Sequence, residues 1–227
     1  DPQLVAQMRK FISKLESSSV TARSLARALD KALLDIDVAR EFNLPPPPEP
    51  LLYEIEGGMP LSILDLHPEE VARQLALVEW QSWSMINNSE FLHNAWTKPD
   101  KEKNSPNILI MIRASNKRIN WISSEILMQQ ELKTRALVLT KFLTIAEKSL
   151  ALNNYNAVME IYAALQTVAI HRLKMTFDLL PQKACDTLDK LSQLWGAEGN
   201  WATLRDTLRK AAPPCIPYLG FFLTDLT

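Results

Sequence analysis

The chain has 227 residues, of which 47% are hydrophobic and 22% charged, enough for one large buried core and a smaller neighbour. Its net charge of −1 argues against a nucleic-acid binder or an acidic-membrane binder, and no apolar run reaches membrane-spanning length. The isolated cysteines Cys185 and Cys215 argue against a disulfide framework or a structural metal site and fit a reducing compartment.

Residues 1–42 carry the pattern of two short amphipathic helices. Asp1 followed by Pro2 is a typical helix start, and Ser17–Ser19 separates the two apolar stripes. Such helices need a surface to pack on, so we expect them to dock on a larger domain, with a free-standing partner motif as the alternative. Because the first residue is Asp rather than Met, we expect a fragment of a longer protein.

Residues 43–60 are expected to form a linker. The run Pro45–Pro48 favours extended polyproline geometry and acts as a semi-rigid spacer, although a ligand role for it is an alternative. Gly57 and Gly58 then favour a turn. The main domain is therefore expected to cover residues 61–227.

The main domain opens with predicted amphipathic helices. His67 and Pro68 form a cap and a first helical residue, with Val71, Leu75 and Val78 expected on the buried face. Ser105 and Pro106 start a second long helix, and residues 131–150 form a third. The buried face of the second helix is expected to contain Ile108, Ile112, Ile119, Ile122 and Ile126.

Residues 152–177 begin with asparagines whose side chains can accept hydrogen bonds from the free N–H groups of a helix start. Met159, Gln166 and His171 fall off the apolar stripe of this helix. The stripe is predicted to contain Val158, Ile161, Tyr162, Leu165 and Ala169.

The remaining chain predicts a helix from Pro181, a break at residues 196–199, a short helix over residues 201–211 and a rigid turn at residues 213–217. Residues 218–227 are expected to start another helix.

Residues that could carry catalysis are scarce. The three histidines lie on separate predicted elements, and the sequence has no Gly-rich phosphate loop and no nucleophile motif. Adjacent Glu69 and Glu70 point about 100° apart on a helix, which does not suit an acid–base pair. The residues alone therefore predict an all-α, multi-helix, intracellular domain without a defined function.

Four blocks of the sequence stand out: residues 66–75 (LHPEEVARQL), 96–121 (WTK, then SPNILIMIR, then W), 152–177 (LNNYN, then IHRLKMTF) and 213–226 (PPCIPYLG, then LTDL). In this order they resemble the catalytic domain of Ras guanine-nucleotide exchange factors. Residues 1–42 more loosely resemble the last helices of the Ras-exchanger motif, the module that precedes that domain.

The resemblance implies an all-α bowl that binds the switch II segment of a Ras-family small GTPase, while a helical hairpin on the rim opens switch I. The hairpin is expected to be truncated in this chain. Such a factor promotes GDP release so that GTP can bind, a signal-transduction step without covalent chemistry, cofactor or metal. It binds the nucleotide-free GTPase better than the loaded one, so nucleotide affinity falls by the same factor.

The resemblance also implies which residues contact the GTPase, with Arg113 pairing with a switch II carboxylate. Thr224 and Thr227 are expected on the hairpin side, towards the nucleotide site. The full contact set is Leu109, Ile112, Arg113, Asn116, Met159, Gln166, His171, Arg172, Trp201, Tyr218 and Thr224.

Three positions depart from common family residues: Gln166 replaces Asn, His171 replaces Tyr, and Thr227 replaces an aliphatic residue. They favour the alternative of a non-catalytic helical scaffold that binds a small GTPase or another partner. A hydrolase or transferase on a helical scaffold is a further alternative.

The expected partner is a GTPase of Ras, Rap or Ral type, with no nucleic acid and no direct membrane insertion. The expected location is the cytoplasm, with recruitment to the inner face of the plasma membrane through other domains.

Overall fold

The computed structural model describes residues 10, 49–51, 62–196 and 201–227. The expected helices of residues 1–42 and nearly all of the linker of residues 43–60 lie outside the described residues. Residues 50–227 form one compact unit. The described part of this unit consists of helices and connecting turns without a β-strand, which confirms the all-α prediction.

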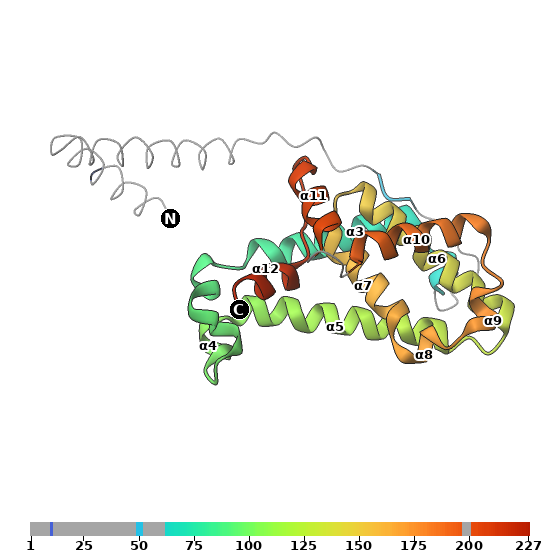
Figure 1. Ribbon diagram of the computed structural model, residues 1–227, viewed down its shortest axis with the longest axis horizontal. Helices are drawn as coiled ribbons and strands as arrows, with labels where there is room; N and C mark the ends of the chain where they lie inside the picture. The colour runs from blue at the N-terminus through green and yellow to red at the C-terminus, as the bar shows by residue number, and fades with distance from the viewer. Residues whose placement is uncertain (1–9, 11–48, 52–61, 197–200) are drawn as a thin grey trace. The chain divides into compact units, whose positions relative to one another are not determined.

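The helices follow one another with short connections (Figure 1). In chain order they are η2 (Ile63–Asp65), α3 (Pro68–Ser84), η3 (Asn88–Thr97), α4 (Lys101–Asn104), α5 (Pro106–Leu127), α6 (Leu132–Ala151), α7 (Tyr155–Gln166), α8 (Val168–His171), α9 (Lys174–Phe177), α10 (Gln182–Trp195), α11 (Ala202–Lys210) and α12 (Leu219–Asp225).

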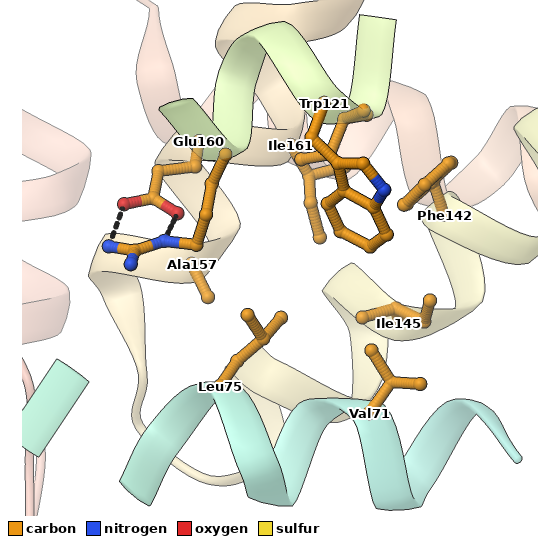
Figure 2. Close-up of a pocket in the computed structure, with 10 residues that line it drawn as sticks. Val71, Leu75, Trp121, Phe142, Ile145, Ala157, Glu160 and Ile161 are labelled. Carbon is orange, nitrogen blue, oxygen red and sulfur yellow. Dashed lines mark hydrogen bonds and ion pairs between the residues drawn. The ribbon is translucent and has the colours of Figure 1, made fainter. Parts of the chain in front are cut away.

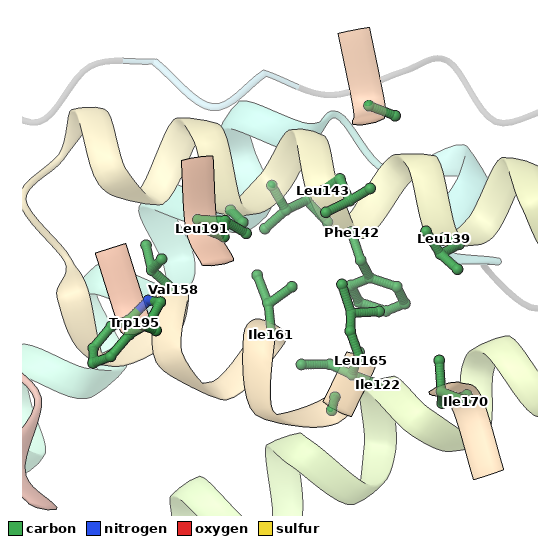
Figure 3. Close-up of a cluster of buried hydrophobic side chains, with 14 of the residues drawn as sticks. Ile122, Leu139, Phe142, Leu143, Val158, Ile161, Leu165, Ile170, Leu191 and Trp195 are labelled. Atoms are coloured by element: carbon green, nitrogen blue, oxygen red, sulfur yellow. The ribbon is translucent and has the colours of Figure 1, made fainter. Parts of the chain in front are cut away.

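Helix α7 lies at the centre of the packing. It contacts α3, α5, α6 and α10, and α6 in turn packs along α3. Figure 3 shows Ile161 and Leu165 of α7 facing Phe142 and Leu143 of α6 in the main hydrophobic core. Burying each of these large side chains contributes about 1.5–3 kcal/mol. A central, almost fully buried α7 therefore fixes the positions of the surrounding helices.

Two of the predicted helix starts are confirmed together with the side-chain hydrogen bonds that cap them. His67 Nδ1 accepts a hydrogen bond from the Glu69 N–H at 3.3 Å, and Pro68 is the first residue of α3. Asn154 accepts one from the Ala157 N–H at 3.2 Å through its side chain. Each bond satisfies a donor that the first turn of a helix leaves free.

The predicted buried face of α3 was wrong at one position. Val78 is 52% exposed, whereas Glu79 is fully buried. The buried stripe runs through Ala72, Leu75 and Glu79, which have helical spacing. A carboxylate is rarely fully buried unless it is paired, so the sequence pattern favoured the valine. Glu79 occupies the core position because it faces a charged partner on another helix.

The prediction of a continuous apolar stripe from Val158 to Ala169 was also wrong. Helix α7 ends at Gln166 because Thr167 is extended, with φ −59° and ψ 142°. The Thr167 hydroxyl donates to the Ala164 carbonyl at 2.7 Å, and a separate helical turn, α8, follows. The new direction of the chain leaves Ala169 exposed.

Candidate functional site

A cavity of about 140 Å³, here called the aromatic pocket, contains several of the expected contact residues. It brings together four residues of the expected contact set: Met159, Trp201, Tyr218 and Thr224. They come from α7, the residue before α11, the residue before α12, and α12. The rest of the wall consists of Trp195, Leu204, Gly220 and Phe221, which sequence reasoning missed.

Two edge-to-face aromatic pairs shape this pocket. The rings of Trp195 and Tyr218 are 5.6 Å apart with an interplanar angle of 89°. Trp201 and Phe221 are 6.3 Å apart at 69°. A Cβ at Gly220 would overlap the Tyr218 ring, so only glycine lets that ring fold back over α12. These contacts favour a rigid apolar pocket that could hold one side chain of a partner.

The Tyr218 hydroxyl stays neutral in this setting. Burial is the main reason that the pKa of Tyr218 is raised, and the negative charge of Glu160 adds to the effect. The pocket therefore offers a partner apolar surface and one neutral hydroxyl. None of the described residues that line it is charged.

A buried charge network connects α7, which lines the pocket, with α3 and α5. Arg118 of α5 donates from Nε to Glu160 Oε2 at 2.5 Å and from Nη2 to Glu160 Oε1 at 2.7 Å. Figure 2 shows the two bonds as dashed lines at the labelled Glu160. Asn156 Nδ2 also donates to Glu160 Oε1 at 2.8 Å. Glu79 of α3 reaches the same guanidinium, with Oε1 3.3 Å from Arg118 Nε.

The guanidinium of Arg118 thus interacts with two buried carboxylates, those of Glu79 and Glu160. Burial, followed by the negative charge of Glu160, raises the pKa of Glu79 to about 8, although Arg118 opposes the shift. The adjoining cavity of about 10 Å³ in Figure 2 has room for about one water molecule, so this network holds helices together and does not bind a ligand. Sequence reasoning missed it; the helical spacing of Glu79 with Ala72 and Leu75 was the available signal.

The expected contact residues on α5 lie apart from the aromatic pocket lining. Leu109 is buried and offers little surface to a partner, Ile112 is half-buried, and Arg113 and Asn116 are exposed. Arg113 forms an ion pair with Glu102 of α4, and the two side chains are 57% and 59% exposed. An exposed pair of this kind contributes at most about 1 kcal/mol, so a partner's carboxylate could replace Glu102.

Gln166 and His171 lie together at an open cavity of about 460 Å³ bordered by α7, α8, α9 and α10. Arg172 is exposed next to His171 but does not line this cavity. The Thr224 and Thr227 hydroxyls donate to backbone carbonyls one turn earlier in α12, at 2.9 Å and 2.7 Å. The expected contact residues therefore lie in three places: on α5, around the aromatic pocket and around the open cavity. Contact with a partner stays a prediction for each of them.

In residues 62–196 and 201–227, no group of three or more His, Cys, Asp or Glu side chains could hold a metal ion. None of the helices placed by the structure combines the length and apolarity needed to cross a bilayer.

The chain is similar to known proteins over most of its length. A family model described as the RasGEF domain matches residues 70–227. The chain is 34% identical over 232 residues to Ras guanine nucleotide exchange factor A of Dictyostelium discoideum, a match that covers 100% of this chain and 38% of that protein. It is 41% identical over 158 residues to factor Y of the same organism, covering 70% of this chain and 10% of that protein. The chain thus spans well under half the length of these relatives.

Proposed function

The chain belongs to the RasGEF domain family, and from this premise we propose that it is the catalytic domain of a guanine-nucleotide exchange factor for a Ras-family small GTPase. It binds the GTPase, opens its switch regions and promotes GDP release so that GTP can bind. The observation that carries the proposal is the aromatic pocket, because it assembles Met159, Trp201, Tyr218 and Thr224 from segments far apart in the sequence.

The pocket suits one apolar side chain of the GTPase as an anchor. Burying a large apolar side chain contributes about 1.5–3 kcal/mol. If the contact forms only with the nucleotide-free GTPase, it lowers nucleotide affinity by roughly 10- to 150-fold, since about 1.4 kcal/mol corresponds to a tenfold change. Larger effects need further contacts, and the exposed Arg113 on α5 is suited to supply a charge-assisted one.

The proposed mechanism requires no bond to be made or broken in the nucleotide. Catalysis here means that the exchange factor favours the nucleotide-free GTPase through differential binding. The proposed place of action is the cytoplasm, at the inner face of the plasma membrane, and this rests on the proposed partner alone.

The test is release of a fluorescent guanine nucleotide from a panel of Ras-, Rap- and Ral-type GTPases, with the full-length protein that contains this chain. Arg113→Glu should abolish acceleration without changing thermal stability. Lys133→Glu makes the same charge change at an exposed position of α6, beyond the far end of α5, and should leave exchange intact. Binding of a nucleotide-free GTPase without accelerated release would favour the scaffold instead.

A further inference from the structure

Arg205 of α11 contacts two residues of α12, Phe221 and Asp225, which are one helical turn apart. Arg205 donates from Nη1 to Asp225 Oδ2 at 2.9 Å and from Nη2 to Asp225 Oδ1 at 2.7 Å. Its guanidinium carbon also lies 4.1 Å from the centre of the Phe221 ring. The planar fork of arginine suits both contacts, because it can pair with a carboxylate through two hydrogen bonds and stack on an aromatic face.

The spacing of the two contacts restricts how α12 can rotate. Phe221 and Asp225 are four residues apart, so they lie on the same side of α12. A side chain that holds both positions fixes the rotation of α12 about its axis as well as its distance from α11. We call Arg205, Phe221 and Asp225 the α11–α12 clamp.

The clamp lies directly behind the aromatic pocket. Phe221 and Thr224 of α12 and Leu204 of α11 line the pocket, and Phe221 also packs against the Trp201 ring. Arg205 and Asp225 do not line it, so neither would contact a side chain bound there. A rotation of α12 would move Thr224 and the Phe221 wall together, and the pocket would change shape.

We propose that Arg205 and Asp225 are positioning residues, which set the shape of the aromatic pocket and hence the affinity for the partner. The proposal rests on the exchange function proposed above. A surface ion pair usually contributes little to stability. The clamp differs because its carboxylate is bound by two hydrogen bonds, and because the Arg205 side chain is only 25% exposed and covers an aromatic ring.

The test compares Asp225→Asn and Arg205→Gln with a matched control, Asp206→Asn. Asp206 forms an ion pair with Lys210 at 2.5 Å on the same helix, without reaching α12. In steady-state nucleotide release, each clamp variant should raise the KM for the GTPase by roughly three- to tenfold, with kcat changed by less than about twofold. The double variant should be no worse than Arg205→Gln alone, because the contact that Asp225→Asn removes is one that Arg205→Gln also removes.

A spectroscopic readout separates failure of the clamp from failure of the exchange function. Trp201 and Trp195 line the pocket, so both clamp variants should change the near-UV circular dichroism or tryptophan emission, and Asp206→Asn should not. Unchanged spectra in the clamp variants would overturn the inference even if the wild type proved inactive as an exchange factor. An equal rise in KM with Asp206→Asn would overturn it as well.

Discussion

The buried carboxylate of Glu79 should make the stability of this protein depend on pH, and Glu79→Gln should remove most of that dependence. The Glu79 side chain is fully buried, and its partner Arg118 already gives two hydrogen bonds to Glu160. Burial and the charge of Glu160 therefore raise the pKa of Glu79 from 4.5 to about 8. Glutamine keeps the shape of the side chain and cannot ionise.

Whether stability rises or falls with pH follows from the direction in which the pKa of Glu79 is shifted. The folded pKa lies above the unfolded one, so folding takes up a proton between pH 4.5 and about pH 8. The contribution of Glu79 to stability is greatest below pH 4.5 and falls by up to about 1.4 kcal/mol per pH unit until the loss levels off above the folded pKa. Between pH 5 and pH 7.5 the loss is about 3 kcal/mol, so Glu79→Gln should be more stable than the wild type at pH 7.5 by up to about 3 kcal/mol, with little difference at pH 5.

Urea unfolding between pH 5 and pH 8 measures this effect, and Glu90→Gln supplies a control of opposite sign. Glu90 is also buried, and burial by itself raises the pKa of its carboxyl. Hydrogen bonds from Asn107 Nδ2 at 2.8 Å and from the N–H groups of Asn107 and Ile108 at 2.8 Å and 3.1 Å lower it overall. The stability that ionised Glu90 contributes is present above its pKa in the unfolded chain and is lost as the pH falls through its pKa in the folded protein. Glu90→Gln should therefore lower the free energy of unfolding by about 1–3 kcal/mol at neutral pH.

The reasoning would be refuted by a wild type whose stability does not fall between pH 5 and pH 7.5. A Glu79→Gln variant less stable than the wild type at pH 7.5 would refute it too. That result would mean that ionised Glu79 contributes more through Arg118 than its burial costs.

Three further predictions concern the proposed contacts and the core. Tyr218→Ala should reduce nucleotide release more than it reduces stability, because it removes a pocket wall; a drop in melting temperature that accounts for the whole loss would contradict this. Glu102→Gln should free Arg113 and strengthen binding of nucleotide-free GTPase by at most about fivefold, measured by calorimetry, and weaker binding would count against competition between Glu102 and the GTPase. Phe142→Ala should lower the free energy of unfolding by about 3–5 kcal/mol in urea titrations, since Phe142 lies in the centre of the core; a loss below about 1 kcal/mol would be inconsistent with its packing.

Local residue patterns were enough to predict the all-α class, the family and helix starts such as those of α3 and α7. Capping bonds such as those of His67 and Asn154 join groups two or three residues apart, so the local residue types are enough to predict them. The RasGEF resemblance was likewise carried by contiguous blocks, and the family match over residues 70–227 confirmed it.

Which side chains meet depends on the tertiary structure. The burial of Glu79 depends on Arg118 from another helix, and a carboxylate in a helical pattern gives no sign of such a partner. The end of α7 at Gln166 and the pairing of Arg113 with Glu102 were equally absent from the sequence pattern. The aromatic pocket exists because α7, α10, α11 and α12 converge, and that convergence is set by long-range packing, which no spacing within one segment encodes.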